Sequence, residues 1–234
     1  MPAQTDRAPI SIVIPTLNAM GNLPRCLESL MEGLPAGLIR DVIVSDGESE
    51  DATCRLAEAA GASVVSGRAS RGGQLRRGCA LAKGDWLLVL HADSVLPPGW
   101  AEQVATHIHE SSDPAAFHLS FRAAGLAPVW VAGWANFRSR VFGLPFGDQG
   151  LLLQRADYES AGGYPDIPLM EDVALVQSLK RAGKPPVLIS TIISSGADRY
   201  RSNGWVRRGA RNLWTQIRYF AGVSPEKLAR AYMR

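Results

Sequence analysis

The sequence alternates short apolar runs with helix-like segments at close intervals through residues 10–90. Glycines such as Gly61 and Gly84 follow two of the helical segments, as expected where a helix ends. We expect strands at residues 10–15, 41–45, 63–65 and 86–90, and helices at residues 23–31, 51–60 and 74–82. Because parallel strands need crossover connections between them, this order predicts a mostly parallel sheet flanked by helices.

The second half of the chain has a looser pattern. We expect strands at residues 116–121 and 150–154, and helices at residues 129–141, 172–182 and 205–220. The sequence contains no internal repeat, low-complexity tract or obvious linker. A single α/β domain over residues 1–234 therefore fits the whole chain best.

Composition favours an enzyme of the cytoplasm. Hydrophobic residues make up 46% of the chain, enough for a core, and no run is long enough to span a membrane. The first apolar run is too short for a signal peptide and contains Pro15. The three cysteines are odd in number and scattered, so neither a disulfide framework nor a zinc site is expected.

The segment GDWLLVLHAD at residues 84–93 places a carboxylate where ligands bind in α/β proteins. Side chains alternate along a strand, so His91 and Asp93 are expected to project to the same side at its end. The carboxyl ends of the strands form the ligand-binding edge of such a sheet. Asp93 there suits a divalent cation held mostly by nucleotide phosphates, and a turn-capping role for Asp93 is the equal alternative.

Two other acidic segments lie at expected element ends. Asp46 ends a strand before Gly47, where it can accept hydrogen bonds from a nucleobase or ribose, or simply shape an ordinary strand–turn–helix connection. Glu171 and Asp172 precede an apolar helical pattern. A carboxylate in a helix's first turn is oriented and kept ionised by the helix dipole, which suits a general base but also an acid that only stabilises the helix.

Arginines cluster at residues 68–77 and 199–218, and neither stretch contains an acidic residue. Both clusters are candidates to face an anionic ligand or a lipid surface, or to be solvated faces. The helix expected in the second cluster carries an apolar stripe made of Val206, Ala210, Leu213, Ile217 and Phe220. We expect the stripe to dock on the sheet and bring Arg207 or Arg208 near a diphosphate, with an anionic bilayer as the alternative partner. The same question arises for the aromatic-rich segment 128–142, which we expect to pack in the core or between subunits of an oligomer rather than to contact a membrane.

Taken together, these segments resemble the family 2 glycosyltransferases, which have the nucleotide-sugar-binding GT-A fold. The resemblance covers nearly the whole chain in the right order. It rests on SIVIPTLN (11–18), DGESED (46–51), GRASRGGQ (67–74), HAD (91–93), GDQ (147–149), MED (170–172) and RYFAGVSPEKLARAY (218–232). The chain looks most like a small bacterial subgroup associated with arsenosugar biosynthesis. Within this fold, residues 8–97 would form the nucleotide-binding half and residues 98–234 the acceptor half.

The resemblance implies a role for each matching residue on the donor side. Those that would bind the nucleotide sugar are Pro15, Thr16 and Asn18 in the first loop, Asp46 at the base, Arg71 and Gln74 at the ribose or diphosphate, and Arg207 or Arg208 at the diphosphate. Asp93 would bind Mg²⁺ or Mn²⁺ bridging the diphosphate. The sequence departs from the family's usual Asp-x-Asp because His91 occupies the first position. His91 would favour Mn²⁺ if it touches the metal, but we expect it to hydrogen-bond the sugar or ribose.

On the acceptor side, the resemblance makes Asp172 the base that removes the proton from the attacking hydroxyl. Glu171 would orient the acceptor or stabilise the loop, and Asp148 and Gln149 would line the acceptor or donor-sugar pocket. The expected activity is inverting transfer of a sugar from a UDP- or GDP-sugar to a hydroxyl acceptor, with no nucleic-acid partner. A nucleotidyltransferase would carry a basic Gly-rich loop after the first strand, where this chain has PTLN (15–18). The other alternative is a non-catalytic module that binds a nucleotide sugar or associates with a membrane, and the presence of both Asp93 and Asp172 argues against it.

Overall fold

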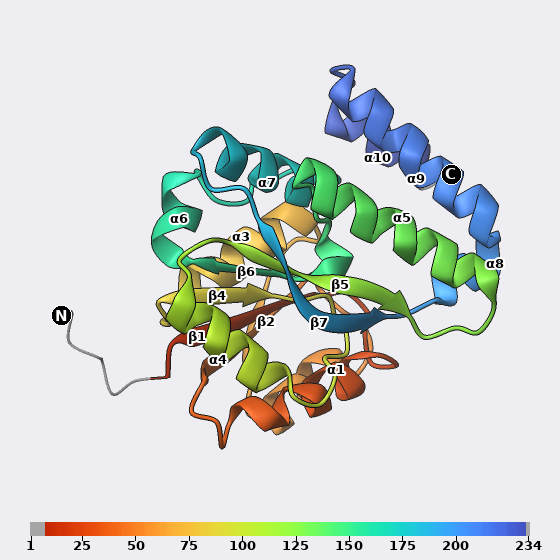
Figure 1. Ribbon diagram of the computed structural model, residues 1–234. Helices are drawn as coiled ribbons and strands as arrows, with labels where there is room; N and C mark the ends of the chain where they lie inside the picture. Colours follow the sequence, from red (N-terminus) through yellow and green to blue (C-terminus); the bar gives the residue numbers. More distant parts are fainter. Residues whose placement is uncertain (1–7, 233–234) are drawn as a thin grey trace.

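The computed structural model describes residues 8–232, apart from the side chains of residues 199, 202 and 203. Its centre is one seven-stranded sheet in the order β3-β2-β1-β4-β6-β5-β7 (Figure 1). The strands are β1 (Ile10–Thr16), β2 (Ile39–Asp46), β3 (Ser63–Ser66), β4 (Trp86–Val89), β5 (Ala115–Phe121), β6 (Leu151–Gln154) and β7 (Val187–Ser195). The expected α/β class, with a mostly parallel sheet in a single domain, is therefore confirmed.

Among the strands of residues 8–232, β6 is the one that runs against its neighbours. It pairs antiparallel with β4, with Trp86 opposite Gln154 and Val89 opposite Leu151, and antiparallel with β5. The chain enters β6 from the 3₁₀ helix η2 (Gly147–Gln149), which lies at the carboxyl edge of the parallel strands. Because the strand starts from that edge, it must run back across the sheet. This reversal brings η2 to the edge where ligands bind in α/β proteins.

Helices cover both faces of the sheet, with α1 and α4 below it and α3, α6 and α7 above it in Figure 1. They are α1 (Leu23–Leu30), α2 (Thr53–Ala59), α3 (Arg71–Leu81), α4 (Trp100–Glu110), α5 (Leu126–Phe142), α6 (Arg155–Ser160), α7 (Glu171–Arg181), α8 (Asp198–Asn203), α9 (Trp205–Phe220) and α10 (Pro225–Tyr232). Alternating side chains of β1 serve the two cores: Ile12 and Ile14 pack toward α1 and α4, and Val13 packs toward α3 and α7.

The sequence pattern does not predict several of the observed elements. Helix α4 follows Pro97 and Pro98 through Gly99, whose φ of 85° suits glycine, and it buries Trp100 and Val104 completely. The edge strand β7 is rich in serine and contains a buried Thr191, so it lacks the continuous apolar run of a central strand. The short helices α6, α8 and α10 are also additions to the expected elements.

Helix α9 has the expected bounds, but the side that packs against the rest of the molecule is not the expected one. Its apolar stripe faces solvent, with Val206 83% exposed and Ile217 50% exposed, whereas Arg208, Thr215 and Gln216 are buried. The expected docking of the stripe on the sheet is therefore wrong. The inward face of α9 is polar because it forms hydrogen bonds with α8 and α10 rather than covering apolar sheet residues. None of the described helices has both the length and the hydropathy that a bilayer crossing requires.

Candidate active site

The ends of β1 and β2 form a tightly hydrogen-bonded corner. Thr16 and Asp46 lie opposite each other in the parallel register, and Thr16 Oγ1 donates to Asp46 Oδ1 at 2.7 Å. Ser49 donates its N–H to Asp46 Oδ2 and its hydroxyl to Oδ1. Although burial opposes ionisation, these donors lower the pKa of Asp46. Thr16 and Asp46 are both buried, and Oδ2 of Asp46 accepts the Ser49 N–H, so this oxygen keeps a lone pair for a further donor.

The loop after β1 is held in place by hydrogen bonds to the loop after β2. Asn18 has a φ of 50°, donates its N–H to Ser49 Oγ, and accepts from the Glu50 N–H through its side-chain oxygen. This conformation leaves Asn18 exposed, next to the half-buried Pro15 and the buried Thr16. Pro15, Thr16 and Asn18 therefore lie together at the carboxyl end of β1 and in the loop that follows it.

Gln74 braces the same corner from helix α3. It is buried, and its Nε2 donates to the carbonyl oxygens of Thr16 and Ser45 at 2.7 and 3.1 Å. From the same helix, Arg77 donates to the carbonyls of Asp46 and Gly67. The amide nitrogen of Gln74 is thus committed to the strand ends, so Gln74 positions the corner. Arg77 was not singled out as a site residue, although it lies in the first arginine cluster.

Arg71, at the start of α3, links two other segments. Its Nη2 lies 2.6 Å from His91 Nε2, and its Nε lies 3.0 Å from Glu171 Oε1. Because a guanidinium only donates, Nε2 of His91 must accept, which leaves the ring proton on Nδ1. Strand β4 ends at Val89, and residues 92–93 form a turn, so strand alternation does not govern the directions of His91 and Asp93 as expected.

Burial dominates the electrostatics of this pair. Glu171 is only 2% exposed, and burial raises its pKa to about 7, with Arg71 opposing the shift and Asp172 adding to it. Burial also disfavours the charge on Arg71, but Glu171 and Asp172 outweigh it and raise the pKa of the guanidinium. The site therefore holds a fixed positive charge between a histidine and a carboxyl that titrates near neutrality.

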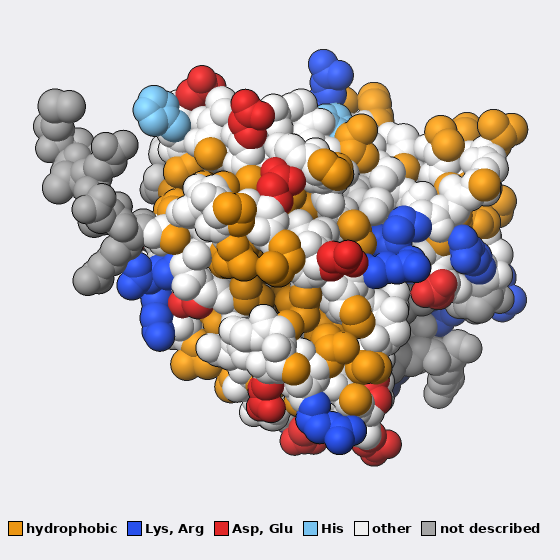
Figure 2. All heavy atoms as spheres, turned by 90° about the horizontal axis from the view of Figure 1, so that it is seen from below, with side chains coloured by type: hydrophobic (Ala, Val, Ile, Leu, Met, Phe, Trp, Pro, Cys, Tyr) orange, Lys and Arg blue, Asp and Glu red, His pale blue; other side chains and the backbone are white. Residues whose placement is uncertain are grey.

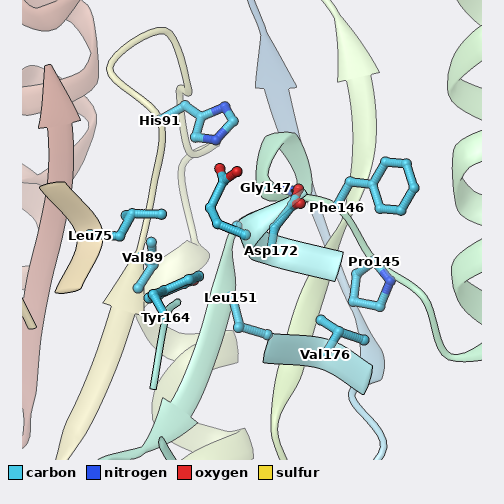
Figure 3. Close-up of a pocket in the computed structure, with 12 residues that line it drawn as sticks. Leu75, Val89, His91, Pro145, Phe146, Gly147, Leu151, Tyr164, Asp172 and Val176 are labelled. Carbon is cyan, nitrogen blue, oxygen red and sulfur yellow. The ribbon is translucent and has the colours of Figure 1, made fainter. Parts of the chain in front are cut away.

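Asp172 is oriented by backbone donors. It lies in the first turn of α7, as expected, after Met170 in a left-handed conformation. Its Oδ2 accepts from the Gly147 N–H at 2.7 Å and its Oδ1 accepts from the Val173 N–H at 2.7 Å. Figure 3 shows Asp172 and His91 pointing into the same space above Tyr164 and Leu151. The carboxylate keeps unused lone pairs that can receive a proton.

Asp148, in η2, contributes an unsatisfied buried oxygen. Its Oδ1 has no hydrogen-bond partner among the described residues. Burial raises the pKa of Asp148 to about 6; Arg138 opposes the shift, and Asp172 and Asp93 add to it. A buried carboxylate oxygen without a donor, close to two other carboxylates, is what a bound cation or substrate group would stabilise.

Asp93 lies in a turn that Arg122 fastens to β7. Arg122 donates to the carbonyl oxygens of Asp93 and Ser194 at 2.7 and 2.6 Å. A Cβ at Gly196 would lie 2.9 Å from Asp93 Oδ2, so a larger residue there would displace this carboxylate. Within residues 8–232, no three His, Cys, Asp or Glu side chains form a metal site by themselves. A cation at Asp93 fits these residues if donor phosphates complete its ligands.

Gln149 supports the site from behind. It is fully buried, its Oε1 accepts from Ser139 Oγ at 2.7 Å, and its Nε2 donates to the Phe117 carbonyl at 3.2 Å. This burial contradicts the expectation that Gln149 lines a substrate pocket. Arg138, also buried, donates to the Leu144 carbonyl and lies over the Phe146 ring, 3.5 Å from its centroid. Arg138 was missed because a helical arginine ordinarily faces solvent.

The two arginines expected at the diphosphate have different surroundings. Arg207 is exposed, on the solvent side of α9. Arg208 is buried and donates to the Tyr232 hydroxyl at 2.7 Å, and that hydroxyl donates to Asn212. The Tyr200 hydroxyl accepts a hydrogen bond from Asn212. Burial raises the pKa of Tyr200, and the nearby Asp148 carboxylate adds to this shift. Arg208 therefore reaches the neighbourhood of the site through a polar network, and Arg207 does not join it.

The fold and this edge define the class of protein. A family model described as glycosyl transferase family 2 matches residues 11–130. The chain belongs to this family, and the sheet with its flanking helices is the GT-A fold. A comparison with curated proteins finds no match.

Solved structures give the same fold. TarS 1–349 from S. aureus in complex with UDP is 16% identical over 80% of this chain and 60% of that chain, with a TM-score of 0.63. Glucosyl-3-phosphoglycerate synthase from Mycobacterium tuberculosis, in complex with Mn²⁺, UDP and glucosyl-3-phosphoglycerate, is 22% identical over 81% of this chain and 70% of that chain, with a TM-score of 0.56. The chain thus spans under two thirds of the TarS fragment.

Proposed function

We propose that the protein transfers a sugar from a nucleotide-diphosphate sugar to a hydroxyl acceptor, with inversion at the anomeric carbon. The observation that carries this proposal is the Asp172 carboxylate, held by the Gly147 N–H beside the linked groups His91, Arg71 and Glu171. Membership of glycosyl transferase family 2 supports the reaction class. The complexes of similar structures with UDP support the donor class.

The proposed roles are those that the family resemblance implies, and the position of each group supports its role. Asp172 accepts the proton of the acceptor hydroxyl as the acceptor oxygen bonds to the anomeric carbon. At the same time the bond between that carbon and the β-phosphate oxygen breaks, and both of its electrons stay on the leaving diphosphate. Arg71 places positive charge near the departing diphosphate. A bound Mg²⁺ or Mn²⁺ would neutralise the charge that develops on the leaving diphosphate. Asp93 would hold that cation, with Asp148 beside it.

His91 has a positioning role in this proposal. Its Nε2 lone pair already accepts from Arg71, so metal ligation through Nε2 would require that bond to break. Its expected contact is a hydrogen bond to the donor sugar or ribose. Thr16, Asn18 and Asp46 form the nucleotide corner. The resemblance to the arsenosugar-associated subgroup gives the first acceptor class to assay.

Calorimetry of UDP and GDP binding tests the donor and metal parts together. With Mn²⁺ or Mg²⁺ present, the preferred nucleotide is expected to bind roughly tenfold more tightly, or better, than with chelator, because a cation held by Asp93 would offset the charge of the diphosphate. Asp93→Ala should remove this gain. Asp113→Ala, an exposed carboxylate in the loop before β5, is the matched control and should keep it. Equal affinity with metal and with chelator would contradict the proposal.

A further inference from the structure

Helices α5 and α9 turn their large apolar side chains away from the rest of the molecule. On α5, Ala132, Ala135 and Ser139 face inward, whereas Trp130 is 80% exposed. On α9 the inward side chains are polar, as described above. The exposed side chains, which we call the α5–α9 face, are Leu126, Val129, Trp130, Trp134, Phe137 and Val141 of α5 and Val206, Leu213, Trp214, Ile217 and Phe220 of α9.

These side chains lie on two neighbouring helices. The exposed residues of α5 recur at three- and four-residue spacing, so they occupy one side of the helix, opposite the side that meets the sheet. The two helices lie side by side in Figure 1, and a Cβ at Gly209 of α9 would lie 3.9 Å from a methyl of Val131 on α5. A monomeric protein rarely exposes so many adjacent apolar side chains without a partner for them.

The charges on this face have one sign. Neither α5 nor α9 contains an aspartate or glutamate. Arg140 and Arg207 are exposed, and Arg211 and Arg218 are half-buried. By contrast, the face seen in Figure 2, beneath α1 and α4, carries acidic and basic side chains together. The α5–α9 face therefore combines exposed tryptophans and aliphatic residues with uncompensated positive charge.

We propose that the α5–α9 face binds the surface of an anionic lipid bilayer. Apolar side chains with arginines at their borders match the acyl–headgroup boundary, where tryptophan is also enriched. A second copy of the chain is a poorer partner, because a twofold contact would bring the same arginines together with no acids on either helix to pair with them. This inference rests on the exposed face alone and is independent of the proposed sugar transfer.

Cosedimentation of the full chain with vesicles tests the proposal. The protein is expected to pellet with phosphatidylcholine vesicles that contain phosphatidylglycerol, and much less with phosphatidylcholine alone. Arg207→Gln with Arg218→Gln should lower the partition coefficient by about 25-fold, at about fivefold per arginine near an anionic surface. Salt at about 1 M, where the Debye length is about 3 Å, should mimic the double replacement. Trp130→Ser with Val206→Ser should also weaken binding, and this loss should persist at high salt.

The control variant is Arg25→Gln with Arg55→Gln, which removes the same charge from exposed positions of α1 and α2. It should bind anionic vesicles nearly as well as the unaltered protein. Thermal unfolding of each variant checks that the fold is intact. Equal binding to neutral and anionic vesicles, or no binding to either, overturns the proposal. A stable dimer that Trp130→Ser with Val206→Ser dissociates, with no vesicle binding, assigns the face to a second copy instead.

Discussion

At the scale of single residues, Arg71 joins groups from three segments of the chain. It begins α3, reaches His91 in the turn after β4, and pairs with Glu171 at the start of α7. Each of these groups is polar and partly or fully removed from water, so the loss of one leaves the others poorly paired. The position of Asp172, next to Glu171, therefore depends on residues distant in the sequence.

Replacement of the proposed base separates chemistry from binding. Asp172→Asn keeps the side-chain shape and an oxygen that can accept from Gly147, but it cannot take up a proton. Turnover is expected to fall by roughly 10²–10⁴-fold, the usual contribution of a positioned base, while donor affinity stays nearly constant. Steady-state kinetics and calorimetry on the same preparation measure the two effects. Normal turnover in this variant would move the base to Asp148.

The raised pKa of Glu171 predicts a pH dependence of stability. Its pKa is about 7 in the folded protein and 4.5 ordinarily, so the folded state binds this proton more tightly than the unfolded state does. Its stabilising contribution is full below about pH 4.5 and is lost as the pH rises through about 7. Asp148, with a pKa of about 6, acts in the same direction.

Glu171→Gln should therefore flatten the pH profile. Urea unfolding at about pH 5 and pH 7.5 should show a smaller loss of stability in this variant than in the unaltered protein, with the remaining slope due to Asp148 and other groups. Glu159→Gln, an exposed carboxylate at the end of α6, is the control and should leave the slope unchanged. Identical slopes in all three proteins would contradict the assigned pKa of Glu171.

At the scale of elements, helix α3 is fixed against the loop before α7. A Cβ at Gly72 would lie 1.9 Å from the Pro165 carbonyl oxygen, and the Gly72 N–H donates to the Ile167 carbonyl at 3.1 Å. Ser70 Oγ donates to Asp166 Oδ1 at 2.5 Å. These contacts hold Arg71 and Glu171 at pairing distance, so the two glycines 72–73 form a close packing point rather than a flexible connector.

Gly72→Ala is expected to lower the free energy of unfolding by about 1–3 kcal/mol, because the new methyl group must displace backbone. The control is Gly133→Ala in α5, where a Cβ would meet nothing within 4 Å in the described part of the chain. That change should be neutral or stabilise by up to about 1 kcal/mol, since alanine favours a helix more than glycine does. Urea titrations of both variants measure the difference. Equal stability of the two would contradict the close contact at Gly72.

The spacing of apolar residues predicts an element well when those residues are also the ones that become buried. Strand β1 is a short run that is buried at nearly every position, and helix α7 has buried apolar residues at helical spacing; both form as expected. Helix α9 shows the limit of this reasoning, because a strong stripe specifies one apolar side but not what lies against it. Likewise, Gln74 and Gln149 are polar residues whose burial depends on carbonyls and hydroxyls from distant segments. Sequence spacing contains no information on such partners.

At the scale of the whole molecule, the two expected halves share one sheet. Strand β6, from the second half, pairs with β4 along its full length, from Trp86 opposite Gln154 to Val89 opposite Leu151. A fragment of residues 8–97 would expose the edge of β4 and the side chains of Leu87 and Leu88, which are fully buried in the intact chain. Open apolar strand edges pair with other chains.

We therefore expect the fragment of residues 8–97 to aggregate, whereas the full chain should stay dispersed under the same conditions. Light scattering after dilution from denaturant measures this directly. Addition of a fragment of residues 98–234 before dilution should reduce the scattering, because it supplies β6. A monomeric fragment of residues 8–97 that unfolds cooperatively would contradict this expectation.

The reversed strand also constrains chimeric enzymes. Exchange of the segment after residue 97 with that of another family member would graft a foreign strand onto the middle of the sheet, not a separate module onto its end. The four β4–β6 residue pairs would have to keep their register, because a shift by one residue moves every side chain of β6 to the opposite face. A junction after β6, at residues 155–160, would leave that pairing within one parent.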